Sequence, residues 1–213
     1  MEMFYVTNNT ASAVAIADIP VVDYATDTLG EDFVPEDLVS LNSLDISVAT
    51  DRTFQLQKEA AYALEAMMKA MNIESPATKN TYVTSAYRSY AYQETTFEYY
   101  VKRHMSNDGM TREQAEKMAD TYSARPGQSE HQTGLCVDFM TTTMKNLDES
   151  FENTAAFEWL ARNAHKYGFI LRYPEDKTET TGYKYEAWHY RFVGREAATD
   201  MYESGICLEE YLK

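Results

Sequence analysis

The sequence predicts an α+β fold in which helices flank a central antiparallel sheet. Some segments carry apolar residues at helical spacing, and others combine β-branched and aromatic residues in the manner of strands. The two kinds of segment do not alternate regularly, as they would in a doubly wound parallel fold. With 213 residues, the chain is long enough for a single domain with a sizeable core.

The chain divides into two parts at about residue 45. Residues 1–45 are poor in helix signals and are interrupted by Pro20, Gly30 and Pro35. We expect this part to form an extended arm, with a short strand, that packs on the domain. Residues 46–213 are expected to form the main domain, and no internal repeat or low-complexity tract interrupts them.

Four long segments of the main domain are predicted to be helices, and a short helix is expected near the end of the chain. Apolar residues recur at helical spacing after Asp51, a candidate N-cap. Thr111 and Gln114 match a capping box, and Gly168 is placed to end the last of the four helices. The predicted ranges are 52–72, 90–105, 111–122 and 154–167.

Four further segments are predicted to be strands, at 81–89, 135–140, 169–174 and 185–193. Pro126 and Gly127 predict an irregular loop ahead of the second of these strands. In that strand Leu135 and Val137 should point to one side, and Cys136 and Asp138 to the other.

The charge of the chain argues against two classes of partner. The formal net charge is −15, whereas nucleic acid and anionic lipid both attract basic surfaces. No apolar run approaches the roughly 20 residues of a membrane span. The first ten residues also lack the basic and apolar regions of a signal peptide. We therefore expect no contact of this domain with nucleic acid or membrane, and the acidity is sufficiently explained by solubility.

The two cysteines leave the redox compartment open. Cys136 and Cys207 could form one disulfide or remain two free thiols. Their spacing is unlike that of a paired-cysteine zinc site.

Two short stretches concentrate residues suited to metal chemistry. "SEHQTGLCVDF" begins at Ser129, and "YEAWHYR" begins at Tyr185. A hydrolytic zinc ion needs three protein ligands and one open position, and His131, Asp138 and His189 would supply such a set. Gly134 would let the chain turn tightly between the first two. Their spacing excludes the helical His-Glu-x-x-His arrangement.

Glu186 precedes His189 by three residues and could approach the open side of such a metal as a general base. The residues alone also fit a simpler interpretation, in which the histidines are structural. Glu186 would then be a surface carboxylate paired with Arg191 or Lys184.

The motifs resemble those of a known family. Ser129-x-His131-x-x-Gly134-x-x-x-Asp138 and Glu186-x-Trp188-His189-x-Arg191 are similar to motifs of the VanY-type zinc D-alanyl-D-alanine carboxypeptidases, within the LAS group of peptidoglycan metallopeptidases. "TSAYRSYAYQ" and "GFILRYP" match as well. The resemblance covers about residues 30–205, with the four motifs in the family's order.

The resemblance implies a LAS metallopeptidase-like fold and a Zn²⁺ cofactor bound by His131, Asp138 and His189. Glu186 is then the catalytic base that activates a zinc-bound water. Arg88 is expected to face the scissile carbonyl and to stabilise the developing oxyanion or hold the substrate. From the residues alone, a structural salt bridge is an equal explanation for Arg88.

The resemblance also implies a set of substrate contacts. Gln93 and Ser129 would hydrogen-bond the terminal carboxylate region of the peptide, while Tyr173 and Trp188 would line the cleft. Gln93 could instead belong to a helix surface and Ser129 to a loop cap. Arg125 could brace the loop or touch the substrate.

The function implied is a zinc-dependent D,D-carboxypeptidase that hydrolyses the terminal D-Ala-D-Ala bond of peptidoglycan stem peptides, with residues 46–213 as the catalytic domain. An L,D-carboxypeptidase, a D,D-dipeptidase or a crosslink endopeptidase would use the same scaffold. A non-catalytic zinc-dependent cell-wall-binding module is a further alternative. Such a substrate implies an extracytoplasmic protein, secreted or anchored through a segment outside this sequence.

Two residues depart from the family pattern. Cys136 stands where the family usually has alanine, and Ala187 stands where proline is common. A thiolate ligand would close or retune an open catalytic site, so Cys136 is expected to be a small buried residue rather than a ligand. Ala187 is expected to loosen the turn that carries Glu186, without removing a chemical group.

Overall fold

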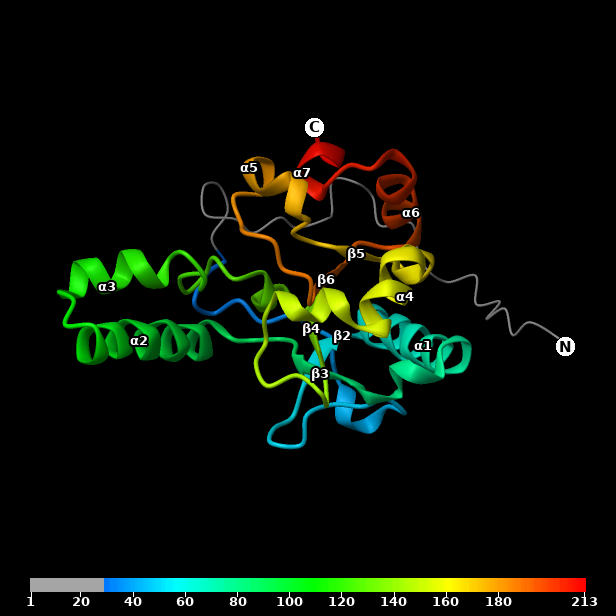
Figure 1. Ribbon diagram of the computed structural model, residues 1–213, viewed down its shortest axis with the longest axis horizontal. Coiled ribbons are helices and arrows are strands. Elements are labelled where there is room, and N and C mark those ends of the chain that lie inside the picture. Colours follow the sequence, from blue (N-terminus) through cyan, green and yellow to red (C-terminus); the bar gives the residue numbers. More distant parts are fainter. Residues whose placement is uncertain (1–28) are drawn as a thin grey trace, which may run out of the picture.

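A four-stranded antiparallel sheet forms the centre of the computed structural model, which describes residues 29–213 (Figure 1). Its strands are arranged in the order β3-β4-β6-β5. Helices lie around it, which confirms the predicted α+β class. The strands are β3 (Thr81–Ser85), β4 (Cys136–Thr141), β5 (Phe169–Leu171) and β6 (His189–Phe192).

A second, two-stranded sheet precedes the first long helix. β1 (Leu38–Ser40) pairs antiparallel with β2 (Gln55–Gln57). The helix predicted from residue 52 therefore begins later, as α1 (Lys58–Glu74). The prediction was wrong at this end because Gln55 and its neighbours pair with β1 instead of starting the helix. Residues 1–28 of the predicted arm lie outside the described residues.

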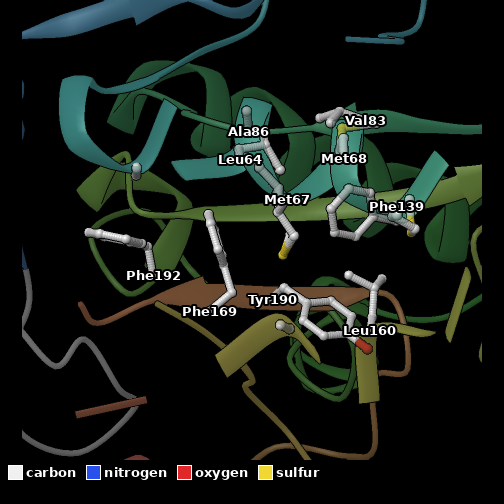
Figure 2. Close-up of a cluster of buried hydrophobic side chains, with 14 of the residues drawn as sticks. Leu64, Met67, Met68, Val83, Ala86, Phe139, Leu160, Phe169, Tyr190 and Phe192 are labelled. Atoms are coloured by element: carbon white, nitrogen blue, oxygen red, sulfur yellow. The ribbon is translucent and has the colours of Figure 1, made fainter. Parts of the chain in front are cut away.

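The main core lies between the sheet and two helices, α1 and α4 (Ala155–Asn163). Figure 2 shows Met67 of α1 and Leu160 of α4 among aromatic residues of the strands, including Phe139 and Tyr190. Burying apolar side chains of this size stabilises the fold by about 1.5–3 kcal/mol each. This core fixes the positions of β4 and β6, the two central strands.

A smaller core covers the edge strand β5. Ile170 packs with Val193, Met201 and Leu208, which belong to the C-terminal part of the chain. The helices of this part are α6 (Arg195–Ser204) and α7 (Leu208–Tyr211), and the short α5 (Thr178–Thr181) lies in the polar segment before β6.

The helices α2 (Tyr90–Asn107) and α3 (Arg112–Ala119) form a hairpin that projects from the body of the molecule (Figure 1). The predicted capping box of Thr111 and Gln114 is present at the start of α3. The hairpin has its own small cluster of buried residues, among them Phe97 and Val101. Within residues 29–213, no helix is both long and apolar enough to cross a membrane.

Several predicted strands and helices are shorter than expected. β3 ends at Ser85, and β6 begins only at His189. The last predicted helix is split, because α4 is followed by a tighter 3₁₀ turn that ends at Gly168. The 3₁₀ segments are Leu41–Ser43, Pro76–Asn80, Glu130–Thr133, Glu149–Asn153, Ala164–Tyr167 and Glu175–Lys177.

Candidate metal centre and active site

The register of β4 and β6 places polar residues together on one face of the sheet. Asp138 lies opposite His189, and Cys136 lies opposite Arg191. Residues directly opposite in a sheet share a face. The other face of both strands carries apolar residues of the main core, such as Tyr190 and its partner Val137. The predicted alternation of β4 is confirmed, and it separates a polar face from the core.

His131 reaches this polar face from the 3₁₀ segment just before β4. Gly134 ends that segment with a φ of 66°, and a Cβ there would lie 3.1 Å from Leu38 Cδ2. The predicted tight turn at glycine is therefore confirmed. His131 Nδ1 donates to the carbonyl oxygen of Ala86 at 2.7 Å. A carbonyl oxygen only accepts, so Nδ1 carries a proton, and Nε2, which lies 3.2 Å from Asp138 Oδ2, is the nitrogen that can bind a metal once it is deprotonated.

His189 completes the group from the first position of β6. Its Nδ1 lies 2.9 Å from Asp138 Oδ1 and 3.7 Å from Glu186 Oε2. The rings of His131 and His189 meet edge to face, with centroids 5.1 Å apart. The residues predicted as metal ligands are thus brought together, and all three are buried.

Glu186 lies on a turn that holds its carboxylate beside this group. The turn is closed by a hydrogen bond from His189 N to Glu186 O at 3.2 Å, and Glu186 N donates to Tyr173 O at 3.1 Å. Burial and the nearby Asp138 carboxylate raise the pKa of Glu186 to about 7, against the opposing effect of His189. The side chain is 22% exposed. Glu186 can therefore take up and release a proton near neutral pH.

Cys136 also lies within reach of a metal at this position. One ligand atom each from His131, Cys136 and His189 lie within 4.8 Å of one another, and all three residues are buried. This is the metal-compatible group found among residues 29–213. Both Cys136 and Cys207 are free thiols, which settles the alternative left open by the sequence.

Glu130, which sequence reasoning missed, links His189 to two buried arginines. Its Oε2 lies 2.9 Å from His189 Nε2. Its Oε1 accepts from Arg172 Nε at 2.8 Å and from Arg191 Nη1 at 2.7 Å. Arg172 also forms a two-pronged ion pair with Glu209. The sequence did carry a signal for this ion-pair network. Glu130 stands directly before His131, and arginines occur in both strand motifs.

The acidic groups around His131 and His189 favour the protonated, positively charged forms of both imidazoles. Burial alone would lower the pKa of His131, but Cys136 and Asp138 raise it to about 9. The pKa of His189 is well above its ordinary value, because Cys136, Asp138 and Glu130 outweigh the effect of burial. A metal ion bound here would take the place of these protons on the histidine nitrogens.

Arg88 lies between the end of β3 and the start of α2, near His131. Its Nη1 donates to Gln93 Oε1 at 2.7 Å, and its Nη2 donates to Ser85 Oγ at 3.2 Å. The amide nitrogen of Gln93 in turn donates to the carbonyl oxygen of Ala124 and to Ser123 Oγ. Gln93 is buried, and protein groups occupy both ends of its amide, so in this structure it orients Arg88.

The other predicted substrate contacts differ in their surroundings. Tyr173 is buried, with its ring 5.0 Å from that of His189 and stacked on Tyr183. Ser129 is also buried, one residue before the 3₁₀ segment that carries His131. Trp188 packs against the main core. Of these three residues, Tyr173 makes a ring contact with a predicted metal ligand, His189.

Two imidazoles and a carboxylate that converge in a buried cluster, with a second carboxylate alongside, form the donor set of a catalytic zinc hydrolase. Comparison with known proteins agrees with this class. The family model of the D-alanyl-D-alanine carboxypeptidases, VanY, matches residues 53–195. The chain belongs to this family.

Individual relatives support the assignment. A D-alanyl-D-alanine carboxypeptidase of Enterococcus faecalis is 44% identical over 130 residues, which is 61% of this chain and 46% of that protein. The chain spans about half the length of the curated relatives it matches.

Solved structures extend the comparison to the fold. The LdcB LD-carboxypeptidase superposes with a TM-score of 0.76 at 35% identity, covering 90% of this chain and 83% of that one. A mutant of the vancomycin resistance D,D-pentapeptidase VanY from a VanB-type cassette, in complex with Zn(II), gives a TM-score of 0.67 at 32% identity, covering 92% and 98%. The predicted LAS metallopeptidase-like fold is therefore confirmed.

Proposed function

We propose that the protein is a zinc-dependent D,D-carboxypeptidase that removes the terminal D-alanine from peptidoglycan stem peptides. The observation that carries this proposal is the convergence of His131, Asp138 and His189 beside the partly exposed Glu186. The membership of the chain in the D-alanyl-D-alanine carboxypeptidase family supports the choice of substrate. The zinc complex of the related VanY enzyme supports the choice of metal.

The donor chemistry of the cluster fits zinc. Nitrogen from His131 and His189 and oxygen from Asp138 are ligands that Zn²⁺ accepts in four-coordinate sites. We assign His131 Nε2, Asp138 and His189 Nδ1 as the ligating groups, because the other ring nitrogens contact Ala86 O and Glu130. A zinc ion held there supplies Lewis acidity, which polarises a carbonyl and lowers the pKa of water.

Glu186 is the proposed proton acceptor. It accepts a proton from the attacking water and delivers it to the amine of the departing D-alanine. Its side chain is 22% exposed and lies 3.7 Å from His189 Nδ1, so the carboxylate is beside the proposed ligands and open to solvent. The turn closed by the hydrogen bond from His189 N to Glu186 O keeps the Glu186 carboxylate beside His189, one of the proposed zinc ligands.

Arg88 is the proposed electrostatic partner of the carbonyl oxygen on which negative charge develops. Its contacts with Gln93 and Ser85 fix the guanidinium near His131 before a substrate arrives. Gln93 then contributes by orienting Arg88, in addition to the substrate contact implied by the resemblance. Ser129, Tyr173 and Trp188 remain proposed substrate contacts.

The substrate sets the proposed setting of the protein. Peptidoglycan stem peptides lie outside the cytoplasmic membrane, so we propose an extracytoplasmic location. The enzyme would be secreted or attached to the cell surface. The formal charge of −15 supports a partner other than nucleic acid.

Release of D-alanine from a pentapeptide that ends in D-Ala-D-Ala tests the function. We expect the zinc-loaded protein to release it and Glu186→Gln to lower kcat by about 10²–10⁴-fold, the usual contribution of a general base. Metal analysis of the variant should still find one bound zinc ion. The matched control is Glu158→Gln, whose side chain is 66% exposed on α4. Absence of release from any muropeptide by zinc-loaded protein would refute the proposal.

A second candidate is an L,D-carboxypeptidase that acts on tetrapeptides. It is favoured by the match to the LdcB LD-carboxypeptidase, whose TM-score of 0.76 exceeds the 0.67 of the VanY structure. Parallel digestion of pentapeptide and tetrapeptide muropeptides, followed by mass spectrometry, separates the two candidates. The same masses would reveal a dipeptidase, by loss of D-Ala-D-Ala, or an endopeptidase, by cleavage of crosslinks.

A further inference from the structure

Cys136 stands on the face of β4 that carries the metal cluster, although a small apolar side chain would be sufficient there. It precedes Asp138 by two residues, so both side chains point to the same side of the strand. Its partner across the sheet is Arg191, whereas the residues of these two strands that belong to the main core, Val137, Phe139, Tyr190 and Phe192, lie on the opposite face. The thiol is fully buried and free. Its position therefore belongs to the polar cluster rather than to the main core.

The donor atoms lie close enough for a metal ion to draw them together by a small side-chain movement. A tetrahedral zinc ion holds nitrogen at 2.0–2.1 Å and sulfur at about 2.3 Å, which places ligand atoms about 3.3–3.6 Å apart. The ligand atoms of His131, Cys136 and His189 already lie within 4.8 Å of one another. Asp138 contacts both histidines through separate oxygens. Two nitrogens and one soft sulfur thus lie close together, and Asp138 adjoins both histidines.

We propose that Cys136 is a fourth protein ligand of the metal in the resting enzyme, together with His131, Asp138 and His189. The inference rests on the proposed zinc site and adds a ligand to it. The thiol releases its proton to solvent as the sulfur–metal bond forms. Four protein ligands close the coordination sphere, so a substrate or water must displace one of them before catalysis. This differs from the expectation from sequence, in which Cys136 was only a small buried residue.

Cobalt(II) spectroscopy tests the inference without relying on activity. The cobalt-loaded wild-type protein should show an intense near-ultraviolet band from thiolate-to-cobalt charge transfer. Cys136→Ala should lose this band while retaining the visible bands of bound cobalt. Cys207→Ser is the matched control, because it removes the other buried thiol and should leave the spectrum unchanged. Serine at this position keeps a side-chain acceptor for the start of α7.

Zinc affinity gives a second readout. Competition with a chromophoric chelator should show at least about tenfold weaker zinc binding for Cys136→Ala than for wild type, since loss of even an outer contact of a zinc ligand costs 10–100-fold. Equal affinity in folded wild-type and variant proteins would contradict the inference.

The wild-type spectrum alone also decides the question if Cys136→Ala fails to fold. Cobalt bound without a charge-transfer band overturns the role of Cys136 and leaves the proposed function standing. Failure of the wild-type protein to bind cobalt or zinc overturns both.

Discussion

Two arginines in different parts of the molecule make the same set of contacts in opposite surroundings. On the projecting hairpin, Arg112 forms a two-pronged ion pair with Glu98 and donates through Nε to Glu116. Behind the candidate metal centre, Arg172 pairs in the same way with Glu209 and donates through Nε to Glu130. The side chain of Arg112 is 56% exposed, whereas that of Arg172 is 0% exposed.

The comparison shows that burial, rather than contact geometry, decides how much such an ion pair contributes to the free energy of unfolding. Water screens the pairs of Arg112, and exposed pairs contribute about 0–1 kcal/mol. The guanidinium of Arg172 is fully buried and its partners Glu130 and Glu209 are 1% and 13% exposed, so water replaces a lost partner poorly. The hairpin ion pairs are replaceable, while the buried ones constrain the residues that hold His189.

The largest effect is expected for Arg172→Ala. Removal of this guanidinium leaves Glu209 without its arginine and Glu130 with only one of its two arginines, and we expect a loss of about 3–5 kcal/mol in the free energy of unfolding. Urea denaturation of the wild type and the variant measures the difference. Arg172→Lys is the companion variant, since it keeps the charge but loses the forked geometry. Its free energy of unfolding should lie between those of the wild type and Arg172→Ala. A loss below 1 kcal/mol for Arg172→Ala would show that the buried ion pairs contribute no more to stability than the exposed pairs of the hairpin.

A smaller effect, on metal binding, is expected for Glu130→Gln. The amide cannot supply the negative charge that orients the ring of His189, so zinc affinity should fall about 10–100-fold. Chelator competition on folded protein measures the change.

Glu209→Gln is the control for this prediction, because Glu209 contacts Arg172 without contacting His189. It should lower stability and leave zinc affinity within a few-fold of wild type. Equal losses of affinity in both variants would show that Glu130 acts only through general stability.

The smallest effect is expected for Arg112→Ala on the hairpin. Its exposed pairs predict a loss of less than about 1 kcal/mol in the free energy of unfolding, and high salt should reduce the loss further. D-alanine release should stay at the wild-type rate. A loss of several kcal/mol that persists at 1 M salt would place the hairpin ion pairs in the same class as those of Arg172.

Most of the secondary structure could be predicted from the sequence, and the errors at strands share one cause. The helices with strong periodicity or caps are present, including α3 with its capping box. The start of α1 was missed because β2 pairs with β1, a contact between segments about 17 residues apart. Local patterns carry no information about such pairing, and they also overestimated the strands that end at Ser85 and begin at His189.

The candidate site was predictable where it consisted of motifs. His131, Asp138, His189 and Glu186 are brought together as their spacing and the family resemblance suggested. Glu130 was missed because its partners, Arg172 and Arg191, lie 42 and 61 residues away. The proximity of Cys136 to both histidines likewise depends on the register between β4 and β6, which only the structure supplies.

Because the cluster and the core share β4 and β6, the proposed catalysis would depend on correct pairing of these strands. One face of each strand carries the cluster and the other carries the core, with Asp138 opposite His189 and Val137 opposite Tyr190. A slip by one residue would turn every side chain to the other face. Tyr190 would then enter the cluster, and His189 would enter the apolar interior. A misfolded isomer of this sheet would therefore be inert from the outset, and activity measured during refolding would count only chains with the native register.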